Sequence, residues 1–158
     1  MSETVPGVLL ALLPLPLTLP VALIDLRQRI IPDGLNLALL AAGLLVAGLR
    51  EPDPVALATR LGEAALAYGL LWAVLAVHAR LRGRVGLGLG DVKFLAAATA
   101  WTGLAQLPVV ILVGSLAALA ALALGAVAGR RIDAATRLPF GPFLALGLHA
   151  ALVLTPAA

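Results

Sequence analysis

The sequence predicts an all-α polytopic membrane protein with about six transmembrane helices. Of its 158 residues, 62% are hydrophobic and 12% are charged, whereas a soluble domain carries about 25% charged residues. Long apolar stretches recur along the whole chain, as expected when the surrounding solvent is a bilayer. Alanine and leucine dominate these stretches, and they lack the alternation that predicts an outer-membrane barrel.

Three spans are predicted in the first half, where charged or Pro/Gly clusters end each apolar stretch and a crossing needs roughly 20 residues. The first span runs from about Val5 to Ile24, and Pro14, Pro16 and Pro20 within it predict a kink or break. No basic residue precedes it, unlike a secretory signal, so we expect it to be retained. The second span covers about Leu35 to Leu49, and the third about Val55 to Ala79.

The second half contributes three more spans. The apolar stretch 92–129 is too long for one crossing, and the turn residues and proline of TGLAQLP (102–108) divide it into two. A last span covers about Phe140 to Leu154. Together the six helices form one transmembrane domain over residues 1–158.

The arginines predict the orientation of these helices. Two arginines, Arg50 and Arg60, lie on the side of the second connection. Eight lie in the first, third and fifth connections: Arg27, Arg29, Arg80, Arg82, Arg84, Arg130, Arg131 and Arg137. Since basic residues mark cytoplasmic loops, we expect these three connections in the cytoplasm and both termini outside. The predicted location is the inner (cytoplasmic) membrane, crossed several times.

The residue inventory excludes several kinds of site. The chain has no cysteine, which excludes disulfides and thiolate metal sites, and two histidines, His78 and His149, are too few for a metal centre. The net charge of +3 is explained by the membrane topology, so it does not indicate a nucleic-acid partner. We therefore expect no metal and no cofactor.

Two aspartates are predicted to lie on the same side of the membrane. Asp25 ends the first span and Asp91 begins the fourth, with two crossings between them. Asp91 can alternatively be read as an ordinary helix N-cap, and Asp33, in the segment IPDG, fits a turn residue. If Asp25 and Asp91 meet, they share a proton, and one can activate water while the other donates to a scissile carbonyl.

The residues around Asp91 favour a site for an extended peptide. Gly86, Gly88 and Gly90 precede it at alternate positions, which a simple N-cap does not require. Glycine permits unusual backbone dihedrals and the close approach of another chain. Lys93 either steadies the acidic pair or the substrate, or extends toward anionic lipid headgroups.

Three motifs resemble one family, the type IV prepilin peptidases, which are GxGD-type membrane aspartic proteases. GLGDVK (88–93) matches the GxGDxK motif of that family. IDLRQRIIPDGLN (24–36) is similar to its first aspartate region, and LPFGPFLALG (138–147) to the Pro-Phe-Gly-Pro stretch that opens its last helix.

The resemblance implies that Asp25 and Asp91 are the catalytic pair. It implies a substrate that is a pilin-like precursor (prepilin, pseudopilin, Flp-type or preflagellin-type), cut at the cytoplasmic face after a short basic leader. Larger family members add an N-terminal cysteine-containing region and methylate the new N-terminus. Because this sequence lacks those cysteines, it resembles the short, protease-only members, and we expect no methyltransferase region.

Two other functions remain as alternatives. One is a catalytically silent subunit of a pilus or secretion assembly, and the other is a small transporter in which the two aspartates relay protons. An inverted repeat would favour the transporter, and the sequence contains none that is evident. Intact aspartates and an intact GxGDxK motif favour the enzyme, whose oligomeric state the sequence does not specify.

Overall fold

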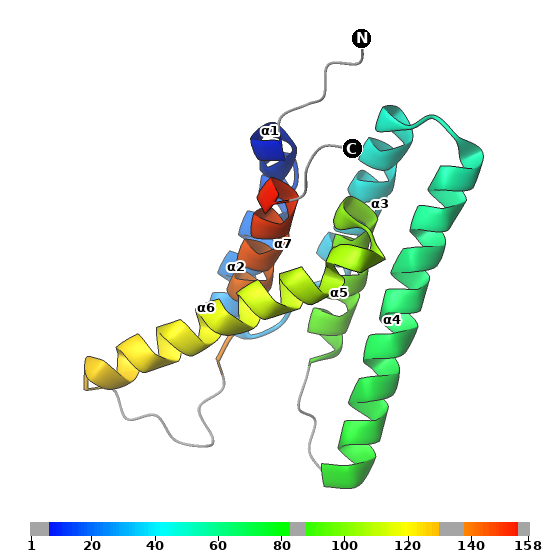
Figure 1. Cartoon of the computed structure of the whole chain (residues 1–158). Coiled ribbons are helices and arrows are strands. Elements are labelled where there is room, and N and C mark those ends of the chain that lie inside the picture. Colours follow the sequence, from blue (N-terminus) through cyan, green and yellow to red (C-terminus); the bar gives the residue numbers. More distant parts are fainter. Residues whose placement is uncertain (1–6, 83–87, 130–137, 155–158) are drawn as a thin grey trace.

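The computed structural model describes residues 7–82, 88–129 and 138–154, and all regular structure in these ranges is helical (Figure 1). The elements are α1 (Gly7–Leu12), α2 (Leu15–Gln28), α3 (Asp33–Arg50), α4 (Pro54–Arg82), α5 (Leu89–Thr102), the 3-10 turn η1 (Leu104–Gln106), α6 (Leu107–Val127) and α7 (Gly141–Leu154). All six predicted segments are helical, which confirms the all-α fold class.

The predicted break in the first span is present between α1 and α2, at Pro14. The break occurs beside the carbonyl of Ala11, which accepts a hydrogen bond from His149 Nδ1 on α7 at 2.6 Å. Because a carbonyl only accepts, Nδ1 carries the proton, and Nε2, 2.8 Å from Thr18 Oγ1, accepts from that hydroxyl. A neighbouring helix therefore satisfies a backbone group at the break, as membrane helices require.

The connection between α2 and α3 differs from the prediction. Helix α2 continues to Gln28 and ends where Arg29 takes a left-handed conformation with φ 56°, so Asp25 lies inside its last turn rather than after it. Pro32 is extended and precedes α3, which begins at Asp33. Asp33 is therefore the first helical residue and not a turn residue.

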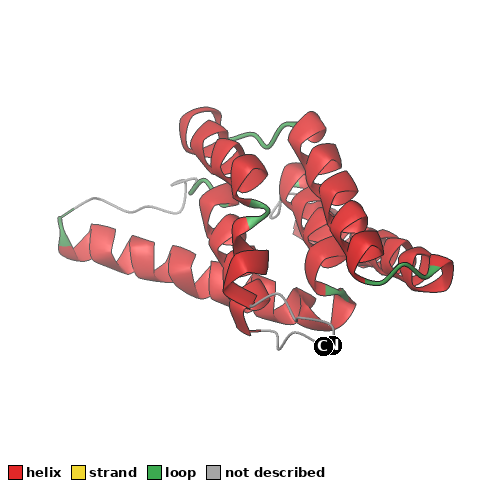
Figure 2. Cartoon of the chain, turned by 90° about the horizontal axis from the view of Figure 1, so that it is seen from above, coloured by secondary structure: helices red, strands yellow, loops and turns green. Residues whose placement is uncertain are grey.

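Helix α5 is the centre of the bundle. It packs against α3, α4 and α7. Figure 2 shows the arrangement of the helices from above. Its 14 residues span about 21 Å at 1.5 Å per residue, less than the ~30 Å hydrocarbon core of a bilayer. Buried residues follow one another around its whole circumference: Val92, Phe94, Leu95, Ala96, Ala97, Ala98, Thr99, Ala100 and Trp101.

Helix α3 faces α5 through a stripe with helical spacing, formed by Asn36, Leu39 and Gly43, all buried. The indole Nε1 of Trp101 on α5 donates to the carbonyl of Leu39 at 2.8 Å. A Cβ on Gly43 would lie 2.7 Å from the same indole ring, so only glycine admits the tryptophan here. The contact sets the register of α3 against α5.

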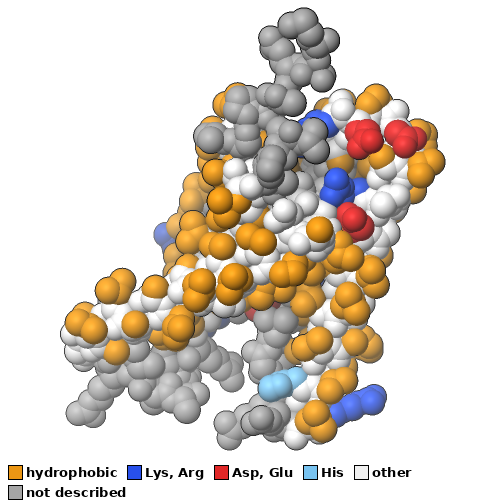
Figure 3. All heavy atoms as spheres, viewed as in Figure 1, with side chains coloured by type: hydrophobic (Ala, Val, Ile, Leu, Met, Phe, Trp, Pro, Cys, Tyr) orange, Lys and Arg blue, Asp and Glu red, His pale blue; other side chains and the backbone are white. Residues whose placement is uncertain are grey.

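The outer surface is that of a helical membrane protein. Large apolar side chains are exposed on α4 and α6, and Figure 3 shows them covering both helices. Within the described ranges, three stretches are long and apolar enough to cross a bilayer: Asp33–Arg50, Pro54–Leu81 and Leu104–Val127. Helix α7 is shorter, and the number of crossings and their orientation stay predictions.

Candidate active site

Asp25 is a buried acid held by the start of another helix. Its side chain projects from the last turn of α2 and the residue is 5% exposed. Its Oδ2 accepts a hydrogen bond from the backbone N–H of Gly141, the first residue of α7, at 2.6 Å. A free N–H at a helix N-terminus stabilises negative charge. The N-terminus of α7 therefore holds the side chain of Asp25 in place.

Asp91 lies in the first turn of α5, outside the three stretches that are long enough to span a membrane. Its Oδ2 accepts from the N–H of Gly88, the N-cap residue, at 3.2 Å. Burial raises the pKa of Asp91 to about 6; the Gly88 hydrogen bond opposes this rise, and the charge of Asp25 adds to it. The two carboxylates are thus within electrostatic range of each other.

The raised pKa of Asp91 predicts its protonation in solution. Asp91 should be protonated below about pH 6, so labelling by a hydrophobic carbodiimide, which attacks protonated carboxyls, should be half-maximal near that pH. Asp25→Asn removes a negative charge and should move this midpoint to lower pH, measured by mass spectrometry of the labelled peptide. Asp53→Asn, at the far end of α3, should leave it in place. A midpoint near 4, the ordinary value of an aspartate, would contradict the prediction.

The glycines before Asp91 provide space rather than unusual dihedrals. Gly88 has φ −71°, which any residue adopts. A Cβ on Gly88 would lie 2.9 Å from Asp91 Oδ2, and one on Gly90 would lie 3.2 Å from the Cβ of Ile31. The expected close approach is therefore present, but it is made by this chain itself. Gly86 lies outside the described residues, and the part that Gly88 and Gly90 take in substrate approach stays a prediction.

Lys93 has a partner that the sequence analysis did not assign. Its Nζ lies 2.7 Å from Oδ1 of Asp33, the first residue of α3. The pair is partly exposed, so its contribution to stability is small. Its geometric effect is to connect the beginning of α3 to the beginning of α5, next to Asp91. Its effect on the acidic pair or the substrate stays a prediction.

The part of the chain that contains these residues also matches a known protein family. A model of the type IV leader peptidase family matches residues 11–127, a range that contains both Asp25 and Asp91. This chain belongs to the type IV leader peptidase family. The α7 segment that contacts Asp25 lies outside the matched range.

Relatives within the leader peptidase family are similar over most of this chain. A "Prepilin leader peptidase/N-methyltransferase" of Burkholderia pseudomallei (strain 1026b) is 41% identical over 140 residues, which are 85% of this chain and 42% of the relative. One of the same description from Aeromonas salmonicida (strain A449) is 37% identical over 93% of this chain and 50% of its own length. "Leader peptidase HopD" of Escherichia coli is 36% identical over 77% of each chain.

The chain thus spans half or less of the length of the first two relatives. No solved structure matches it.

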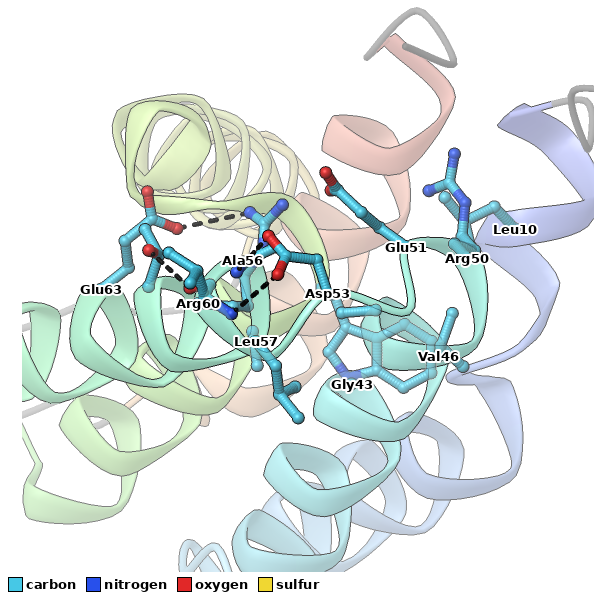
Figure 4. Close-up of a pocket in the computed structure, with 15 residues that line it drawn as sticks. Leu10, Gly43, Val46, Arg50, Glu51, Asp53, Ala56, Leu57, Arg60 and Glu63 are labelled. Carbon is cyan, nitrogen blue, oxygen red and sulfur yellow. Dashed lines mark hydrogen bonds and ion pairs between the residues drawn. The ribbon is translucent and has the colours of Figure 1, made fainter.

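A cavity of about 630 Å³ lies at the opposite end of α3 and α5 from the aspartates (Figure 4). Three of the charged side chains that line it, those of Asp53, Arg60 and Glu63, have structural partners. Asp53 accepts from two backbone N–H groups of the first turn of α4, at 3.1 and 3.2 Å. Arg60 pairs with Glu63 at 3.3 Å, and Glu63 also accepts from the N–H of Leu104. These contacts connect α4 to η1, and neither Asp25 nor Asp91 lines the cavity.

Two residues at the acidic end were missed by the sequence analysis. Gly141 is part of the quoted motif LPFGPFLALG, but nothing in the motif indicates that its N–H binds Asp25. Asn36 is 4% exposed, and its Nδ2 donates to the carbonyl of Gly90 at 3.3 Å. The available signal was its spacing from Leu39 and Gly43, which places a polar side chain on a buried stripe.

The described residues contain no group of three His, Cys, Asp or Glu side chains that could hold a metal ion. The described residues at this end of the bundle supply two carboxylates and the backbone N–H groups beside them. One carboxylate accepts a hydrogen bond from the first N–H of α7, and the other has a raised pKa. Such a pair can transfer protons in both directions.

Proposed function

We propose that this leader peptidase is a membrane-embedded aspartic endopeptidase with Asp25 and Asp91 as its catalytic pair. What supports the proposal is that two acids from separate helices lie at one end of the bundle, close enough for the charge of Asp25 to help raise the pKa of Asp91. A shared proton between two such acids is the basis of aspartic-protease chemistry.

The two environments suggest separate roles for the acids. Asp25, beside the N-terminus of α7, acts as the general base and takes a proton from water. The resulting hydroxide attacks the scissile carbonyl carbon, while protonated Asp91 donates its proton to the carbonyl oxygen. The tetrahedral intermediate then collapses: the C–N bond breaks, Asp25 returns its proton to the leaving nitrogen, and Asp91 recovers the proton from the hydroxyl.

The proposed substrate is a pilin-like precursor whose short basic leader is removed at the cytoplasmic face. Support comes from the names of the relatives, which are prepilin leader peptidases, and from the arginine distribution, which favours a cytoplasmic position for this end of the bundle.

Cleavage of a co-expressed precursor tests this function. The leader peptidase should shorten a pilin-like precursor by the length of its leader, seen as a gel shift and located by mass spectrometry of the new N-terminus. A silent assembly subunit or a proton-coupled transporter would leave every precursor at full length.

The membrane orientation has its own test, based on the eight-to-two distribution of arginines between the two sides. A reporter fused after Arg82 should report a cytoplasmic position, and one fused after Ala158 an external position. Alkaline phosphatase and a fluorescent protein, active on opposite sides, provide matched readouts. Reversed signals would place Asp25 and Asp91 at the external face and remove cytoplasmic cleavage.

A further inference from the structure

The carboxamide oxygen of Asn36 is a buried acceptor that the described part of the chain leaves without a donor. Asn36 is 4% exposed, and its Nδ2 donates to the carbonyl of Gly90. Its Oδ1 has no hydrogen-bond partner among the described residues. An amide oxygen in such a position is costly because it has lost its water without gaining a donor.

The position of Asn36 connects this oxygen to the acidic pair. Its amide group bonds to Gly90, the residue immediately before Asp91. Two further contacts hold this end of α3 against α5: Ile31 packs on Gly90, and Lys93 pairs with Asp33. The unpartnered oxygen therefore lies next to the first turn of α5, at the end of the bundle where Asp25 meets α7.

A leucine would fill the same place on the stripe without an unpaired oxygen. The other buried members of that stripe, Leu39 and Gly43, have no polar side-chain atom. A polar residue at this position is explained if a ligand supplies the missing hydrogen-bond donor. An extended peptide that enters an apolar site brings backbone N–H groups that also need partners. The oxygen of Asn36 needs a donor, and the N–H groups of the peptide need an acceptor.

We propose that Asn36 Oδ1 accepts a hydrogen bond from a backbone N–H of the substrate peptide close to the scissile bond. Asn36 is then a substrate-binding residue that sets the position of the peptide relative to Asp91. The inference rests on the proposed function, because it takes the ligand of the acidic end to be a peptide.

The test measures binding, so that it does not depend on cleavage. Synthetic precursor peptides, each with one backbone N–H replaced by an ester oxygen, are titrated against Asp25→Asn protein in lipid nanodiscs. An ester at one position should weaken binding about two- to tenfold, as expected for the loss of one neutral hydrogen bond. With Asn36→Leu added, the same ester should have no effect on the dissociation constant.

A second variant separates this role from a purely structural one. Asn36→Asp and Asn36→Leu both lose the donor to Gly90, but only the aspartate keeps an acceptor. The ratio of ester to amide dissociation constants should stay high in Asn36→Asp and fall to one in Asn36→Leu. If Asn36 had only a structural role, the ratio of ester to amide dissociation constants would change equally in both variants. That result would overturn the proposal.

The remaining outcomes are also decisive. If no ester weakens binding, or if the precursor does not bind, the proposed hydrogen bond does not exist. If Asn36→Leu in the enzyme with intact aspartates lowers kcat and leaves KM unchanged, the oxygen holds the attacking water instead of the peptide. A failure of the proposed function has a different signature, since precursors would then bind with the expected ester pattern yet stay uncut.

Discussion

Asp25→Asn and Asp91→Asn should each abolish leader cleavage while the protein remains inserted and folded. Asparagine preserves the shape of the side chain but cannot ionise, so the pair can no longer exchange protons between water and the peptide. We expect the rate of cleavage to fall by about 10⁴-fold or more for each variant, and the double variant to be no slower than either single one, because residues that act as a unit are non-additive. The measurement is the fraction of co-expressed precursor converted, normalised to the membrane level of each variant.

The matched control is the same substitution at the opposite end of the bundle. Asp53 caps the first turn of α4, and asparagine is as good a cap as aspartate, so Asp53→Asn should leave cleavage unchanged. Asp33→Asn removes the ion pair with Lys93 but keeps a polar side chain, and it should retain most activity. If both Asp25→Asn and Asp91→Asn still cleaved the precursor, the aspartic mechanism would have to be abandoned.

Gly141→Ala should slow the proposed leader cleavage, although Gly141 offers no reactive side chain. A Cβ on Gly141 would lie 2.9 Å from Asp25 Oδ2, closer than real Cβ contacts allow, and 3.1 Å from its Cγ. The backbone N–H of Gly141 also donates to Asp25 Oδ2, at 2.6 Å. The added methyl group would therefore displace the carboxylate from this hydrogen bond. A displacement of about 1 Å can cost about 10²-fold in rate, and we expect a loss of that order.

Gly69→Ala is the corresponding control. Gly69 lies on α4, and a Cβ there would meet no atom within 4 Å; alanine is the better helix former by about 1 kcal/mol. This variant should keep full activity and melt at the same or a slightly higher temperature. If Gly141→Ala cleaved as fast as Gly69→Ala, the contact between α7 and Asp25 would have no catalytic consequence. A loss of the Gly141→Ala protein from the membrane would indicate a folding defect, and the comparison of rates per inserted molecule separates the two.

The sequence by itself was sufficient for the order of the helices. In a bilayer, apolar length determines what can be a helix, and prolines and charged clusters mark the ends. For this reason the helical segments, the break within the first span and the division at TGLAQLP are where the pattern predicts them. The two acids were identified by their position at span ends and by the motif around Asp91, and the family assignment agrees with that motif.

Only the tertiary structure decided which side chains meet at the acidic end. The donor to Asp25 is Gly141, 116 residues away, and Lys93 forms an ion pair with Asp33. The orphan oxygen of Asn36 is likewise visible only after α3 and α5 have been packed together. Such contacts depend on how each helix is rotated about its own axis.

That rotation is hard to read from a sequence of this kind for a physical reason. In a soluble protein, a polar stripe identifies the outer face of a helix. Lipid is as apolar as the protein interior, so the outer and inner faces of a membrane helix have similar side chains and the periodic signal is lost. Helix α5 is the clearest case: it is apolar on all sides, and its burial between α3, α4 and α7 was decided by packing at small residues such as Gly43, where a tryptophan fits only because a side chain is absent.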